Sequence, residues 1–295
     1  MYLIECNNLG FMTPAKRKAN LLQNVSFTLP QGARLALAGG NGAGKSTFLK
    51  LLLGLEPIGE GEVSILGSLV PSVKSRTHIG YLADEPSPFA YLSGKEYLEL
   101  YGRLEGFRGN ELKDKVVKAL SQSGLTDAAN VRTENYSKGM RQRLEIERVM
   151  LKGRKLILLD EPLTGLDIES QLFFKKRLNQ LAADGVSMII TSHEPSILEA
   201  VATHIAVLHF GKLAVFGKID KLLTEKGWEI VYKDSQAVPD KLPKGAKPGG
   251  QNNSFLFSDR KDAETELKNN MNEQVLSFGS AIKGIEDLMA EVTAK

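Results

Sequence analysis

The fold is decided by Gly39-Gly40-Asn41-Gly42-Ala43-Gly44-Lys45-Ser46. This glycine-rich stretch follows a short apolar run, Arg34-Leu35-Ala36-Leu37-Ala38, which has the length and composition of a buried strand. A helical pattern runs from Ser46 to Leu53 and ends at Gly54. The order strand, glycine-rich loop, helix predicts an α/β domain built around a parallel sheet.

The same stretch predicts a binding site, because it satisfies the pattern G-x-x-x-x-G-K-[ST]. In such a loop, backbone N–H groups converge on the β-phosphate of a nucleotide, and the dipole of the following helix adds positive potential. The lysine supplies charge to the β- and γ-phosphates, the serine hydroxyl binds Mg²⁺, and the next threonine reaches the α-phosphate. The residues expected to bind the nucleotide are Gly39, Asn41, Gly42, Ala43, Gly44, Lys45, Ser46 and Thr47, with Ser46 also a metal ligand.

Polar side chains follow two further predicted strands, residues 155–159 and 186–191. Asp160 and Glu161 come directly after the first strand, and His193 follows the second. Because the carboxyl ends of parallel strands meet at one edge of a sheet, these side chains are expected near the glycine-rich loop. We predict that Asp160 orients Mg²⁺, that Glu161 is the general base for the water that attacks the γ-phosphate, and that His193 contacts this phosphate.

The pattern of elements predicts two domains. Strand and helix patterns fill residues 1–225, with a helical insertion at about residues 85–140. Residues 237–253 are rich in Pro, Gly, Lys and Asn and predict a loop. Short alternating apolar runs flank this loop, and an apolar stripe with helical spacing lies near the end of the chain. Residues 226–295 are therefore expected to form a small α+β domain.

Composition narrows the function classes. The chain is 42% hydrophobic and 25% charged, which is typical of a globular protein. Its formal net charge is +3, and Lys and Arg form no long run, so no nucleic-acid partner is expected. Cys6 is the only cysteine, which excludes an intramolecular disulfide. The chain shows neither a signal-peptide pattern nor an apolar run near the roughly 20 residues that span a bilayer, so a cytoplasmic location is expected.

A second motif, Tyr136-Ser137-Lys138-Gly139-Met140-Arg141-Gln142-Arg143, brings in a family resemblance. It resembles the signature motif of ABC transporter ATP-binding subunits, usually Leu-Ser-Gly-Gly-Gln followed by a basic helix, and the resemblance covers about residues 1–225. It implies that Ser137 and Gly139 contact the γ-phosphate of ATP bound to an opposite subunit. By the same resemblance, Asp167 in Leu163-Thr164-Gly165-Leu166-Asp167 communicates between the two sites.

Besides Tyr136, Lys138 and Met140 in the signature motif, position 84 departs from the family pattern. Residues 79–84 resemble a stretch that normally ends in a magnesium-contacting Gln, but Asp84 stands there, with Glu85 beside it as the alternative. A carboxylate can bind Mg²⁺ or its water. The family also stacks adenine on an aromatic residue before the phosphate-binding loop, for which Phe11 is the candidate and Tyr2 the alternative. A core role for Phe11 is equally open, because aromatic side chains are mostly buried.

The resemblance implies a P-loop ATPase with ATP and Mg²⁺ as cofactors. Because one signature motif completes the site of another chain, it also implies a head-to-tail homodimer. The Ser-Lys-Gly-Met-Arg-Gln-Arg form is similar to bacterial exporter ATPases that serve a separate integral membrane permease at the inner face of the cell membrane. The alternative is a soluble ABC ATPase of translation or chromosomes. A single motif set, with 92 residues from Lys45 to Ser137, argues against this alternative.

Overall fold

The computed structural model describes residues 2–12, 20–223, 225–233, 243, 246–249, 254–269, 275–282 and 284–293. The chain divides into two compact units, Met1–Ile219 with Val292–Lys295, and Asp220–Glu291. Each unit has its own sheet structure and is described by itself. Within the part of the chain that the structure describes, no helix is both long and apolar enough to cross a bilayer.

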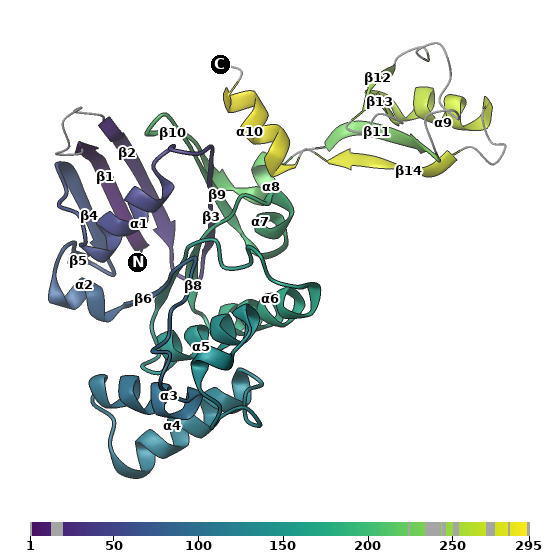
Figure 1. The fold of residues 1–295 in the computed structure, drawn as a ribbon. Coiled ribbons are helices and arrows are strands. Elements are labelled where there is room, and N and C mark those ends of the chain that lie inside the picture. Colours follow the sequence, from purple (N-terminus) through teal and green to yellow (C-terminus); the bar gives the residue numbers. More distant parts are fainter. Residues whose placement is uncertain are drawn as a thin grey trace. The chain divides into compact units, whose positions relative to one another are not determined.

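The first unit is built on a six-stranded sheet (Figure 1). Its strand order is β10 (Lys212–Lys218), β9 (His204–His209), β3 (Arg34–Gly39), β8 (Ser187–Thr191), β7 (Leu156–Leu159) and β6 (Ile79–Leu82). The strands from β9 to β6 pair in parallel, and β9 and β10 form an antiparallel hairpin. Every residue of β7 and β8 is buried, which explains why both strands are almost continuously apolar in sequence.

A second, antiparallel sheet lies beside the first in the same unit. It contains β2 (Asn20–Pro30), β1 (Tyr2–Met12), β4 (Glu60–Ile65) and β5 (Ser68–Leu69), in that order. Helix α1 (Lys45–Leu53) lies between the two sheets (Figure 1). Its buried Phe48, Leu49, Leu51 and Leu52 join both sheets into one hydrophobic core. Burial of this helix therefore fixes where the phosphate-binding loop sits.

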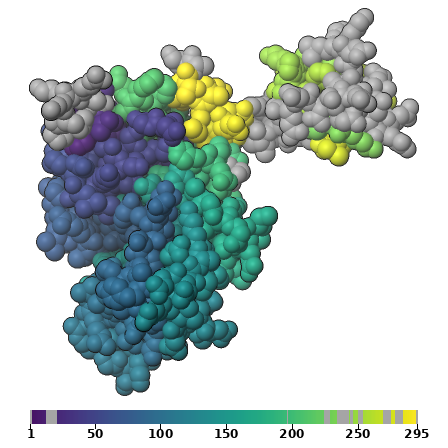
Figure 2. Space-filling model, viewed as in Figure 1, coloured from purple at the N-terminus to yellow at the C-terminus, as the bar shows by residue number. Residues whose placement is uncertain are grey.

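The helical insertion of the first unit contains α3 (Gly94–Leu104), α4 (Gly109–Gln122) and α5 (Lys138–Met150). A capping box starts α3, because Ser93 Oγ accepts from the Glu96 N–H and Glu96 Oε2 accepts from the Ser93 N–H. Tyr97, Leu98, Leu112 and Val116 form the centre of a separate small core. Figure 2 shows the surface of this insertion, blue to teal, continuous with the sheet-bearing part of the unit.

Two more helices of the first unit follow β7 and β8. Helix α6 (Ile168–Ala183) begins directly after the Leu-Asp segment, and α7 (Pro195–Val201) begins shortly after β8. Helix α2 (Val73–Thr77) precedes β6. The α/β class predicted from the sequence is confirmed for this unit.

The second unit carries a four-stranded antiparallel sheet. Its order is β12 (Ala246–Pro248), β13 (Ser254–Phe257), β11 (Glu225–Tyr232) and β14 (Val275–Ile282). The remaining helices are α8 (Ile219–Leu222), α9 (Arg260–Asn269) and α10 (Ile285–Thr293). Ile230, Tyr232, Phe255 and Phe257 form the core of the sheet with Ala263 of α9.

One expectation for the second unit needs correction. Residues 246–248 lie within the predicted loop 237–253, but they form β12 because Ala246, Lys247 and Pro248 pair with β13. Residues 237–242, 244, 245 and 250–253 of that predicted loop lie outside the described residues.

Candidate functional site

The carboxyl ends of β3, β6, β7 and β8 surround one cavity of 310 Å³. Its wall contains most of the phosphate-binding loop and four polar residues that follow the other strands. The lining residues are Leu21, Asn41, Gly42, Ala43, Gly44, Lys45, Ser46, Thr47, Asp84, Asp160, Glu161 and His193. Residues that are far apart in sequence are thus brought to one edge of the parallel sheet, as Asp160, Glu161 and His193 were expected to be.

The start of α1 is open to an anion. Gly44 is its N-cap, with φ 106°, and provides no side-chain cap for the first turn. A Cβ atom at Gly44 would lie 2.7 Å from the carbonyl oxygen of Leu21, so the position admits only glycine. Backbone N–H groups in the first turn of a helix have no intrahelical partner and favour phosphate.

Lys45 is buried at the mouth of this helix, with 8% of its surface exposed. Its Nζ donates to the carbonyl oxygen of Gly39 at 2.7 Å and to that of Gly40 at 3.2 Å. Burial lowers the pKa of Lys45, while the charges of Glu161 and Asp160 oppose this shift. Because water screens this buried group only weakly, an anion that reaches the ammonium group would be attracted strongly and would favour its charged form.

Thr191 holds the two carboxylates after β7 in place. Its hydroxyl donates to Asp160 Oδ1 at 2.7 Å and accepts from the Glu161 N–H at 2.9 Å. Glu161 has φ 47°, an uncommon conformation for a residue with a side chain. The contact from β8 therefore stabilises the turn that directs the two carboxylates. Sequence reasoning missed this role, and the only signal was the position of Thr191 at the end of the predicted strand.

The Glu161 carboxylate is buried, with 8% of the residue exposed. Its Oε2 accepts from Thr164 Oγ1 and from the His193 N–H, each at 3.1 Å. Its Oε1 is buried and lies 3.2 Å from His193 Nε2, but it accepts no hydrogen bond from the residues that the structure describes. A buried acceptor with unused capacity can take a hydrogen bond from water. This arrangement suits a general base.

The donor set of the cavity fits Mg²⁺. Ser46, Asp84 and Asp160 offer hydroxyl and carboxylate oxygens, which this ion prefers together with phosphate and water. Tyr81 of β6 lies near this group. Burial, followed by the negative charge of Asp160, raises the pKa of Tyr81 to about 12, so its phenol stays neutral near the carboxylate.

The signature motif forms a different part of the surface. Ser137 is the exposed N-cap of α5, and its Oγ accepts from the Met140 N–H at 3.2 Å. Gly139 packs so closely against α6 that a Cβ atom there would lie 2.2 Å from Ser170 Oγ. Asp167 is the N-cap of α6, and its Oδ1 accepts from the Ser170 N–H at 2.7 Å. None of Ser137, Gly139 and Asp167 lines the nucleotide cavity.

Gln142 connects the two parts of the site. Its Nε2 donates to the carbonyl oxygen of Pro162 at 2.8 Å, directly after Glu161. The side chain is 1% exposed, so this buried contact joins α5 to the turn that carries Glu161. The sequence placed Gln142 in the signature helix but gave no indication of this partner.

The candidate for adenine stacking lies elsewhere. Phe11 is 6% exposed and belongs to the hydrophobic core, and it is not part of the cavity wall. The structure therefore favours the core role that the sequence had left open. Tyr2 is 49% exposed and also does not line the cavity. Leu21, which sequence reasoning did not select, is the side chain of β2 that does line it.

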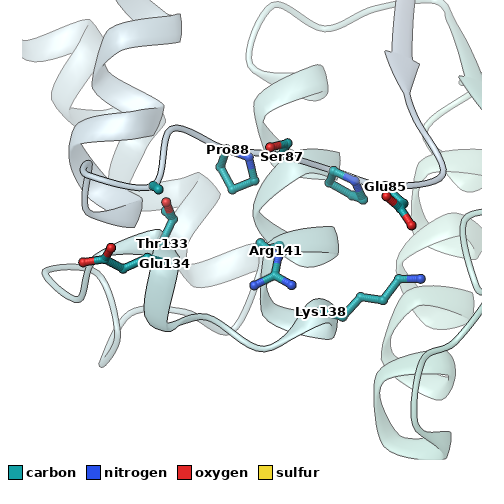
Figure 3. Close-up of a pocket in the computed structure, with 9 residues that line it drawn as sticks. Glu85, Ser87, Pro88, Thr133, Glu134, Lys138 and Arg141 are labelled. Carbon is teal, nitrogen blue, oxygen red and sulfur yellow. The ribbon is translucent and has the colours of Figure 1, made fainter.

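A second cavity, of 450 Å³, lies between residues 85–90 and the start of α5 (Figure 3). Charged groups of both signs surround it, and Figure 3 shows the Glu85–Pro88 segment on one side of it and Arg141 and Lys138 on the other. Its lining residues are Glu85, Pro86, Ser87, Pro88, Ala90, Thr133, Glu134, Lys138 and Arg141. Glu85, the alternative to Asp84 for Mg²⁺, lines this second cavity and not the nucleotide cavity.

Comparisons with known proteins agree with this geometry. The family model described as ABC transporter matches residues 22–164. An ABC transporter ATP-binding protein of Nostoc sp. is 33% identical over 74% of this chain and 68% of its own length. The linearmycin resistance ATP-binding protein LnrL of Bacillus subtilis is 27% identical over 94% of this chain and 87% of its own length.

A solved structure of an ATP-binding subunit of an ABC transporter has a TM-score of 0.67 and 28% identity, covering 75% of this chain and 91% of that one. The fold and the cavity define an ABC-type P-loop ATPase. The chain belongs to the ATP-binding subunits of ABC transporters, with ATP as its nucleotide. The family and the ATPase activity predicted from the sequence are thereby confirmed.

Proposed function

We propose that this chain energises export through a separate integral membrane permease, from the inner face of the cell membrane. ATP hydrolysis is the family's chemistry, and the observation that carries the assignment of its catalytic centre is the Glu161 carboxylate. That carboxylate is buried in the wall of the nucleotide cavity, and its Oε1 accepts no hydrogen bond from the described residues. The export direction is supported by the form of the signature motif and by the likeness to a resistance protein along 94% of the chain.

The roles of the cavity residues follow from their positions. Lys45 and the first-turn amides of α1 hold the phosphates, and Glu161 Oε1 accepts the proton of the attacking water. His193, which lines the same cavity and whose Nε2 lies 3.2 Å from Glu161 Oε1, donates to the γ-phosphate in this scheme. Ser46, Asp160 and Asp84 would hold Mg²⁺, which would neutralise phosphate charge there.

A second copy of the chain completes the site in this proposal. Ser137 and Gly139 lie outside the nucleotide cavity of their own chain, so they serve the phosphate of another. Beside Asp167, α6 exposes two apolar side chains one turn apart, with Ile168 78% and Leu172 63% exposed. Apolar surface at this position favours a protein partner. These two observations support the head-to-tail homodimer of this proposal.

The permease is proposed to dock at the second cavity. This cavity has charges of both signs, and Phe89 and Tyr91 beside it are 43% and 67% exposed. Exposed aromatic residues next to a polar hollow are typical of interfaces. In this scheme, residues 1–225 form the ATPase domain with its helical subdomain at about 85–140, and residues 226–295 form an accessory domain.

The test has two parts. Purified chain should release phosphate from MgATP, and the Glu161→Gln variant from the same preparation should not. Tagged chain recovered from cells should carry an integral membrane protein with it, and charge reversal at Lys138 and Arg141 together should release that protein without unfolding the chain. Recovery with ribosomes or chromosomal DNA in place of membranes would refute the transport assignment.

A further inference from the structure

Arg148 lies where α5, β6 and α3 meet, and the proposed mechanism does not use this residue. Its Nε donates to Glu145 Oε2 at 2.8 Å, and its Nη2 donates to the carbonyl oxygen of Tyr81 in β6 at 3.2 Å. Its guanidinium carbon lies 4.8 Å from the ring centroid of Tyr101 in α3. One planar cation therefore contacts a carboxylate, an aromatic face and a strand carbonyl at once.

Two groups attach this junction to the helical insertion. Tyr101 is one of them, and Tyr97 is the other, because its hydroxyl donates to Glu145 Oε1. Tyr97 is 3% exposed and Glu145 is 6% exposed. Burial, followed by the charge of Glu145, raises the pKa of Tyr97, so its phenol remains a donor throughout the physiological range. A displacement of α3 would therefore pull on Arg148 through two contacts.

On the other side, the junction attaches to the strand that leads into the nucleotide cavity. Among the described residues, β6 is the edge of its sheet and pairs only with β7, so no strand of this part of the chain pairs with its outward carbonyl groups. Arg148 satisfies the one on Tyr81, whose side chain lies near Asp160. The next residue, Leu82, accepts from the Asp160 N–H at 3.0 Å, and Asp84 lines the cavity.

We propose that Arg148 is a positioning residue, which holds β6 so that Asp84 and Asp160 face the bound nucleotide and which passes movement of α3 to them. The role acts through β6, since Arg148 itself is not part of the cavity wall. Lysine cannot replace it, because a single ammonium group cannot contact a carboxylate and a carbonyl in one plane while lying on an aromatic ring.

Two variants test this role without leaving an unpaired buried charge. Arg148→Lys keeps the charge opposite Glu145 but loses the planar contact, and the double variant Glu145→Gln/Arg148→Met removes both charges together. A matched control is the ion pair between Glu147 of the same helix, α5, and Arg177 of α6. Arg177 of α6 donates to Glu147 Oε2 at 2.8 Å, and both residues are almost fully buried. The double variant Glu147→Gln/Arg177→Met neutralises this pair, which links α5 to α6 instead of β6.

The first readout is amide hydrogen exchange in nucleotide-free protein, which does not depend on turnover. Residues 79–84 should exchange about tenfold faster in both Arg148 variants and at the wild-type rate in the control. The second readout is steady-state ATPase activity. We expect kcat to fall about tenfold and the Mg²⁺ concentration for half-maximal activity to rise, with little change in the KM for ATP.

The inference rests on the proposed catalytic centre only for its second readout. If wild-type protein releases no phosphate, the proposed function fails while hydrogen exchange still tests the junction. Unchanged exchange at residues 79–84 in both variants, or an equal change in the control, would overturn the positioning role. If the double variant does not fold, Tyr97→Phe takes its place, because it removes one hydroxyl from the junction. Amide exchange at residues 79–84 must then rise by a smaller factor and stay at the wild-type rate in the control.

Discussion

The nucleotide cavity and the signature motif differ in how far one chain already assembles them. In the nucleotide cavity, residues from four strand ends lie together, and Thr191 and Thr164 already hold the carboxylates with hydrogen bonds. Among the described residues, Ser137 of the signature motif and Asp167 of the Leu-Asp segment hydrogen-bond only to the first turns of the helices that they cap. This difference supports our proposal that a single chain binds and activates the nucleotide and that a second chain supplies the groups that close over the phosphate.

The largest effect on turnover should come from a substitution in the nucleotide cavity. Glu161→Gln removes the proton acceptor but keeps the size of the side chain, so phosphate release should fall about a thousandfold. Affinity for MgATP, measured by calorimetry, should stay within a few-fold of wild type. Glu194→Gln, an exposed change three residues beyond Thr191, serves as the control and should be silent. Normal turnover in Glu161→Gln would remove this carboxylate from the mechanism.

The next largest effect should be on ATP affinity, from a substitution in the phosphate-binding loop. Lys45→Ala deletes a buried ammonium group whose charge-assisted contacts contribute about 3 kcal/mol together, so the Kd for ATP should rise about a hundredfold. Lys50→Ala, on the same helix but exposed, should bind as wild type does. Equal affinity in the two variants would show that the loop is not a phosphate cradle.

A substitution in the signature motif should lower turnover without lowering the nucleotide affinity of a single chain. Gly139→Ala places a Cβ atom against Ser170 Oγ and shifts the start of α5, so turnover should fall about tenfold while nucleotide binding to the separate chain is retained. Adding Ser170→Gly restores the space and should recover part of the activity. Loss of nucleotide affinity in Gly139→Ala would break the distinction between the two parts.

The smallest effect concerns the two adjacent carboxylates after β6. Asp84 lines the nucleotide cavity and Glu85 lines the second cavity, so only the first should affect the metal. In Asp84→Asn, we expect the Mg²⁺ concentration for half-maximal activity to rise about threefold, because a neutral oxygen is a weaker ligand. Glu85→Gln should leave this value unchanged. The reverse result would assign the metal to Glu85.

Sequence spacing was sufficient for the parts of the site that depend on strand ends. The loop at 39–46, Asp160, Glu161 and His193 could be placed together because each follows an apolar run that a parallel sheet must bury. Contacts across elements could not be predicted in the same way. The hydrogen bonds from Thr191 and Gln142 depend on how β8 and α5 pack beside the catalytic turn, and no local pattern records this packing.

Other differences have similar physical reasons. The sequence could not decide between stacking and burial for Phe11, because an aromatic residue near the loop satisfies either role until β1 and β2 are paired. Strand β12 escaped detection because its three residues gain their structure from pairing with β13 and include a proline. Local composition there favoured a turn.

The central claim is that one chain holds only part of an active site and that ATP joins two copies. Sedimentation of Glu161→Gln, with and without MgATP, tests this directly. We predict a monomer without nucleotide and a dimer with MgATP, and we predict that adding Gly139→Ala to the same chain weakens this dimer. A Glu161→Gln chain that binds MgATP with full affinity yet sediments as a monomer would contradict the account.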